Sequence, residues 1–117
     1  MYELMKPILN EQLSSVEFVQ DYLQLHFDGN TLTCYEWPRV VLKSEVYELL
    51  TKGYRDALCK LISYKVENVL LIEESHLEVV FEQGYRIILN LKRNDSNSNL
   101  AEFAYFTSID NKIVVFD

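Results

Sequence analysis

The chain has 117 residues with a net charge of −7, and 49% of them are hydrophobic. This length fits a single domain over residues 1–117, and the composition excludes a disordered chain. Its apolar runs are too short to cross a bilayer, and its basic residues form no stripe for a nucleic-acid backbone. Because the N-terminus does not resemble a secretory signal, we expect a cytoplasmic protein that binds neither membranes nor nucleic acids.

The stretch HFDGNTLTCYEW, residues 26–37, carries turn formers between two alternating runs, and it predicts an antiparallel hairpin. We place Gly29 and Asn30 at the centre of the turn, which sets Phe27 opposite Leu32. A turn one residue earlier would set two carboxylates against each other and put the apolar residues out of step. We therefore favour the first register.

The two faces of this hairpin differ in character, and a change of phase just before it predicts a bulge over residues 19–21. One face is apolar and includes Cys34, whose thiol we expect to be a core group with a raised pKa. The other face mixes aromatic and polar side chains, as partly hydrated contact surfaces do. The candidate binding residues there are Tyr22, Gln24, Tyr35, Trp37 and Arg39. A C-terminal strand carrying Phe103, Tyr105 or Phe116 could instead cover this face.

The middle of the chain predicts a helix followed by a meander. Ser44–Leu50 forms either a short helix or a loop. After Gly53, apolar residues at helical spacing predict an amphipathic helix over residues 54–62. The next segments predict strands over residues 66–73, 77–81 and 85–91.

Turns at 74–75 and 82–84 set the registers of this meander. They place Ile72 opposite Leu77 and Val79 opposite Ile87, so we expect Leu70 and Ile72 to belong to the core face. The back face would still carry four apolar residues, namely Val69, Leu71, Val80 and Ile88. A sheet that is apolar on both faces is covered on each of them, by a helix, by other strands or by another subunit. Because this back face is so apolar, we expect a homodimer.

The last part of the chain predicts one polar loop and one more hairpin. Residues 94–99, NDSNSN, are too polar to bury and should form an exposed loop. Residues 102–108 and 113–116 should pair across a turn at Asp110–Asn111. The order of hairpin, main helix and meander indicates an α+β fold built on an antiparallel sheet of hairpins.

The residues that could carry chemistry form no recognisable catalytic or metal-binding pattern. His26 and His76 lack the spacing of metal ligands, and neither cysteine has a predicted base partner. We therefore expect no catalytic residues, no metal, no cofactor and no enzymatic activity. The alternative is a small-molecule-binding or enzymatic domain that uses a cleft between helix and sheet, with Asp21 and Glu36 as acid–base groups.

Three segments carry a resemblance to a known family, namely VEFVQDYLQLHFDG (16–29), LTCYEWP (32–38) and GYRDALCKLI (53–62). Together they resemble a family of small bacterial proteins of uncharacterised function, over roughly residues 16 to 90. The resemblance implies a stand-alone bacterial cytosolic protein and assigns no catalytic residues. A looser likeness is to the immunity proteins of toxin systems, which are small, acidic and α+β.

These observations lead to one expectation about function. We expect a small acidic protein that works by binding another protein of basic character, or a copy of itself, without catalysis.

Overall fold

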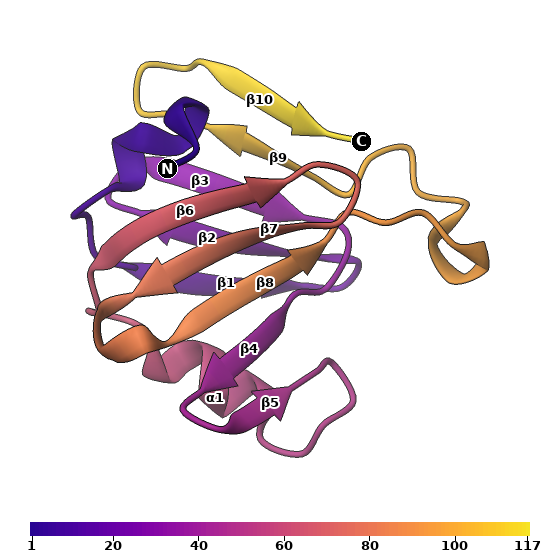
Figure 1. The fold of residues 1–117 in the computed structure, drawn as a ribbon, viewed down its shortest axis with the longest axis horizontal. Helices are drawn as coiled ribbons and strands as arrows, with labels where there is room; N and C mark the ends of the chain where they lie inside the picture. The colour runs from indigo at the N-terminus through magenta and orange to yellow at the C-terminus, as the bar shows by residue number, and fades with distance from the viewer.

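The computed structural model describes residues 1–117 and shows an α+β fold with antiparallel sheets and one main helix (Figure 1). The predicted fold class is therefore confirmed, although the strands divide between two five-stranded sheets. The first sheet, in spatial order, consists of β1 (Ser15–Val19), β2 (Tyr22–Phe27), β3 (Asn30–Cys34), β9 (Ala104–Thr107) and β10 (Ile113–Phe116). The second consists of β5 (Glu45–Tyr47), β4 (Arg39–Leu42), β8 (Arg86–Asn90), β7 (His76–Phe81) and β6 (Val66–Ile72). The helical elements are α1 (Tyr54–Lys60) and the 3₁₀ turns η1 (Glu3–Ile8), η2 (Glu82–Gly84) and η3 (Asp95–Asn97).

The core lies between the two sheets, which face each other in Figure 1. Phe27 of β2 stacks on Phe81 of β7 with ring centroids 6.4 Å apart, and both side chains are fully buried. Removing a side chain of this kind from water stabilises the fold by roughly 1.5–3 kcal/mol. Helix α1 contacts β1 and β4 at one side of the sandwich, and η1 contributes Met5 and Ile8 at the side of β6.

The predicted helix is confirmed, and its apolar stripe faces the core. Tyr54, Ala57 and Leu58 are buried, while Gly53 precedes the helix in the left-handed conformation with φ of 86°. The segment before it was expected to be a short helix or a loop, and the helix alternative is wrong. Residues 45–47 form β5, which pairs with β4.

The register of the first hairpin differs from the prediction by two residues. Phe27 pairs with Asn30, so the turn is Asp28–Gly29, the alternative that we disfavoured. Both turn residues have positive φ, 50° and 96°, as a tight hairpin turn of the primed kind requires. The Asn30 amide is buried and donates to the Phe27 carbonyl over 3.0 Å, which secures this register. Since the slip is two residues, each side chain keeps its predicted face.

The segment before this hairpin holds a second turn in place of the expected bulge. Val19 pairs with Tyr22 across a turn at residues 20–21, so β1 is a separate strand antiparallel to β2. The C-terminal hairpin is confirmed by the pairing of β9 with β10. The polar segment 94–99 is only partly as predicted, because Asn97 is buried and donates to the Lys92 carbonyl.

In the meander, one register is confirmed and the other is wrong by one residue. Val79 pairs with Ile87, as expected. Ile72 pairs with His76 rather than Leu77, and the ladder shifts again near Glu67. A one-residue slip exchanges the two faces of a strand. Val69 therefore belongs to the core, while Ile72 is 52% exposed.

Candidate functional site

The outer face of the first sheet presents side chains in rows that cross the strands. The pairing aligns Gln24 with Thr33, Thr33 with Tyr105, and Tyr105 with Val115. A neighbouring row joins Val19 to Tyr22, whose ring lies against Tyr35. Alternation along each strand fixes these directions, because the adjacent residues Leu23, Leu25, Leu32, Cys34, Ala104 and Phe106 are all buried in the core.

Three tyrosines form a continuous cluster on this face. The ring centroids of Tyr22 and Tyr35 are 5.8 Å apart, and those of Tyr35 and Tyr105 are 6.2 Å apart. All three side chains are only half-buried. We call Tyr22, Gln24, Tyr35, Tyr105 and Val115 the tyrosine face. Tilted aromatic pairs at this spacing hold one another in place and offer a rigid amphipathic surface.

The C-terminal strands extend this face and do not cover it. Because β9 pairs with β3 in the plane of the sheet, Tyr105 joins the cluster, whereas Phe103 and Phe116 are buried. The expectation of a covering strand is therefore wrong. Tyr105 was missed as a binding candidate, although the alternation of FAYFT (103–107) does place it opposite Ala104 and Phe106.

Several polar residues of the outer face are hydrogen-bonded to one another. Gln24 donates to the hydroxyl of Thr33 over 3.1 Å. One ring nitrogen of His26 lies 3.0 Å from the Thr31 hydroxyl, and the other lies 3.1 Å from a carboxylate oxygen of Glu17. These contacts hold the side chains beside the tyrosines in place, and Thr33 itself is buried beneath its neighbours.

The electrostatic surroundings of the tyrosine face are negative. Burial, then the neighbouring Tyr105 and Glu102, raise the pKa of Tyr35 above its ordinary value. Glu17 also points outward, and no lysine or arginine stands among the paired residues at the outward positions of β1, β2, β3 and β9. Such a surface attracts cationic side chains, which bind both carboxylates and aromatic faces.

Two predicted binding residues lie elsewhere. Trp37 follows the end of β3 and lines a cavity of about 380 Å³ with Phe18, Tyr54 and Arg55 at the helix side of the sandwich. Arg39 is exposed at the start of β4, in the second sheet. The structure thus brings together Tyr22, Gln24 and Tyr35 and separates Trp37 and Arg39 from them. The reason is the register, since Tyr22 lies beside Tyr35 and not opposite Trp37.

The proposed acid–base pair does not line the cavity between helix and sheet. Asp21 is exposed in the β1–β2 turn, and Glu36 is half-buried after β3. Arg55 is the one charged side chain that lines the cavity beside Trp37. No three His, Cys, Asp or Glu side chains gather in a way that could hold a metal ion. No helix has the length and apolar character needed to cross a membrane.

The outer face of the second sheet differs from the tyrosine face because charged pairs cross it. Arg86 donates to Glu78 over 2.9 Å, and His76 lies 3.7 Å from the same carboxylate group. Ile88, on the same face, is 9% exposed in the single chain. Long charged side chains shield this apolar neighbour, whereas Ile72 on the same face stays exposed.

Comparison of the chain with protein-family models, with curated proteins and with solved structures found no match. The family resemblance and the likeness to immunity proteins therefore stay predictions.

Proposed function

We propose that this protein is a non-enzymatic binding module, adaptor- or immunity-like, that acts in the bacterial cytoplasm and binds a basic protein partner on its tyrosine face. One observation carries the proposal. Tyr22, Tyr35 and Tyr105 form a half-buried cluster on a sheet face that no other strand covers. Tyrosine is enriched where proteins bind one another, because its ring gives contact area while its hydroxyl stays hydrated.

Charge selects the kind of partner. The chain carries −7 overall, and the tyrosine face has carboxylates at its border and no cation within it. A second copy of the chain would bring like charges together, whereas a basic surface would place arginine or lysine over the rings. Self-association through this face is the less favoured candidate, and capture from a lysate distinguishes a basic partner from a second copy of the chain.

The test is capture from a lysate of the native host with four baits, namely the wild type, Tyr35→Ser, Tyr105→Ser and Tyr47→Ser. Tyr47 is a half-buried tyrosine on β5 and serves as the matched control. We expect the wild type and Tyr47→Ser to retain one basic protein in amounts comparable to the bait. The two face variants should bind it about thirtyfold more weakly, as loss of a central tyrosine costs roughly 2 kcal/mol.

Capture should also weaken at high salt, because exposed charges are then screened. Urea unfolding of each bait confirms that the variants are folded. Equal capture by the folded face variants, capture of the chain's own copies alone, or capture of nothing would contradict the proposal.

A further inference from the structure

The two sheets have four edge strands, β1, β5, β6 and β10, and three of them are protected. The N-terminal segment covers β6, since Tyr2 N–H donates to the Val69 carbonyl over 2.7 Å and Asn10 N–H to the Val66 carbonyl over 2.8 Å. Helix α1 contacts β1, and β5 is only three residues long. The outer edge of β10 receives no backbone hydrogen bond from another segment, and no helix makes a contact with it like that of α1 with β1.

Strand β10 also has the composition of a pairing site. Its residues 113–116, IVVF, are all apolar, and Ile113 and Val115 are 65% and 49% exposed. An exposed apolar edge presents unpaired N–H and C=O groups that can extend the sheet with another strand. Soluble proteins usually blunt such edges, as this chain does at its other three.

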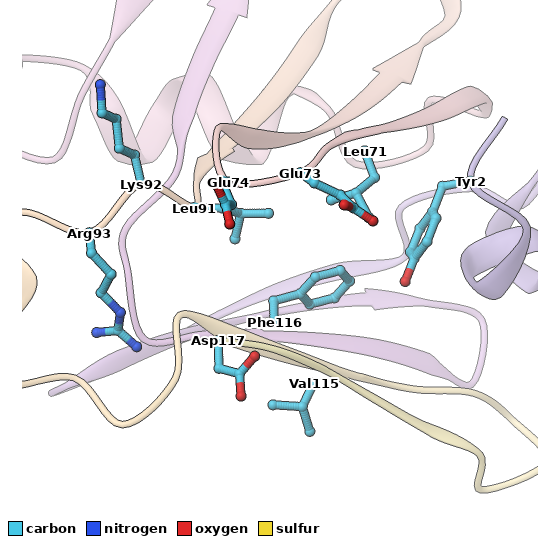
Figure 2. A pocket seen from close by; sticks show the side chains of 10 residues that line it. All are labelled: Tyr2, Leu71, Glu73, Glu74, Leu91, Lys92, Arg93, Val115, Phe116 and Asp117. Atoms are coloured by element: carbon cyan, nitrogen blue, oxygen red, sulfur yellow. The ribbon is translucent and has the colours of Figure 1, made fainter.

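A cavity of about 710 Å³ opens beside β10, on the side of the sandwich where Tyr2 precedes η1 (Figure 2). The apolar residues that line it are Tyr2, Leu71, Leu91, Val115 and Phe116. The rings of Tyr2 and Phe116 are 6.1 Å apart in a tilted arrangement. Successive side chains of a strand point to opposite faces, so a strand added to β10 would turn one of its two faces toward the side of this cavity.

The charged residues of the cavity indicate which side chains such a strand would carry. Glu73, Glu74 and Asp117 form none of the ion pairs in the structure. Arg93 is already engaged, because its guanidinium donates to the Asn97 and Leu100 carbonyls and also lies over an aromatic ring. Lys92 points away from the apolar lining (Figure 2). The unpaired charge around the cavity is therefore mainly negative.

We propose that β10 is a strand-addition site, which binds an extended segment of a partner that alternates apolar with basic residues. Main-chain hydrogen bonds to the free edge would provide affinity. The basic side chains would enter the cavity, where their apolar stems lie over Leu71 and Phe116 and their charged ends meet the carboxylates of Glu73 and Glu74. The apolar side chains would point to the opposite face, beside the exposed Ile113 and Val115. This site shares only Val115 with the tyrosine face, and it does not depend on the function proposed for that face.

The probe for the test is a synthetic peptide that alternates lysine and valine, blocked at both ends. Titration into the full-length protein is followed by NMR, with amide hydrogen exchange read residue by residue. We expect slower exchange at residues 113–116 and shifted signals around Leu71. A peptide alternating glutamate and valine should not bind, and neither should the lysine peptide after N-methylation of the backbone amides on its pairing edge.

Substitutions in the protein test whether the carboxylates of the cavity contribute to peptide binding. Glu73→Gln and Glu74→Gln should each weaken peptide binding about two- to fivefold, as for partly exposed ion pairs. Glu48→Gln removes a carboxylate from an exposed position on another part of the surface and is the matched control. Tyr35→Ser should bind the peptide as the wild type does, which distinguishes this site from the tyrosine face.

Three results would overturn the proposal. Undiminished binding of the N-methylated peptide would show that the β10 edge is not used. Protection confined to β2 and β3 would assign the peptide to the tyrosine face. If Glu73→Gln, Glu74→Gln and Glu48→Gln bound the peptide with equal affinity, the cavity carboxylates would have no part in binding.

Discussion

At the scale of single residues, the most buried titratable groups lie where the chain passes from the first sheet to the second. Burial raises the pKa of the Cys34 thiol from 9.0 to about 12. Burial, then Cys34, also raises the pKa of Tyr54, whose hydroxyl donates to the Pro38 carbonyl. The sequence predicted the buried thiol, because alternation along β3 sets Cys34 on the core face.

This burial predicts how stability depends on pH. In the unfolded chain Cys34 releases its proton near pH 9.0, whereas the folded chain retains it to about pH 12. The free energy of unfolding should therefore fall as pH rises above 9, by at most about 1.4 kcal/mol per pH unit for one group. Urea unfolding of Cys34→Ala should give a flatter curve between pH 9 and 10 than the wild type.

The control is Cys59→Ala, since Cys59 is exposed. This variant should keep the wild-type slope over the same range. An identical slope in Cys34→Ala and the wild type would show that the thiol is not the group responsible.

At the scale of elements, the β2–β3 turn connects two distant parts of the chain. Gly29 lies in it with φ of 96°, and an added Cβ would come within 2.9 Å of Cδ1 of Ile109. The Ile109 N–H in turn donates to the side-chain oxygen of Asn30 over 2.9 Å. The turn is thus secured by a segment about eighty residues away in sequence.

Gly29→Ala tests this contact. A left-handed conformation costs a residue with a side chain about 1–2 kcal/mol, and the contact with Ile109 adds to that cost. Gly84→Ala is the matched control, because Gly84 has φ of 75° and nothing within 4 Å of its added Cβ. The urea midpoint should fall further for Gly29→Ala than for Gly84→Ala. Adding Ile109→Ala to the Gly29→Ala chain should remove this difference. Equal losses in the two glycine variants would contradict the role of the contact.

The same turn shows how far the sequence could predict the site. The faces were predictable, since alternation has a period of two and a two-residue slip preserves it. The register was not predictable, because it depends on the Asn30 side chain. Its amide group donates to the Phe27 carbonyl, and its oxygen accepts from the distant Ile109 N–H. The inclusion of Tyr105 in the tyrosine face was equally hidden, because it requires the long-range pairing of β3 with β9. In β6, the one-residue slip at the turn to β7 could not be seen from composition, which is why Val69 and Ile72 exchanged faces relative to the prediction.

At the scale of the whole molecule, one hydrophobic cluster joins the N-terminal segment to both sheets. Met5 and Ile8 of η1 are fully buried, and Tyr2 contacts Phe116 of the last strand. Elements that share a core in this way are expected to unfold together.

Ile8→Ala tests this cooperativity. It should lower the free energy of unfolding by about 2–5 kcal/mol, as for a buried aliphatic side chain that leaves a cavity. Trp37 fluorescence, at the opposite side of the sandwich, and far-ultraviolet circular dichroism should shift together. Leu4→Ala is the control, since Leu4 is in the same segment and 59% exposed, and it should change stability by less than about 0.5 kcal/mol. A shift in only one of the two signals would show that η1 unfolds separately.

The order of strands in the first sheet has a consequence for synthesis. β3 pairs with β9, and all five strands of the second sheet lie between them in the chain. A nascent chain on the ribosome therefore holds Tyr22 and Tyr35 long before Tyr105 is made, with the edge of β3 still open. Such long-range pairing slows folding, and the open edge is prone to aggregation until β9 arrives. Recognition through the three tyrosines would thus be limited to chains that have finished folding, so a partner could not be captured by an incomplete copy.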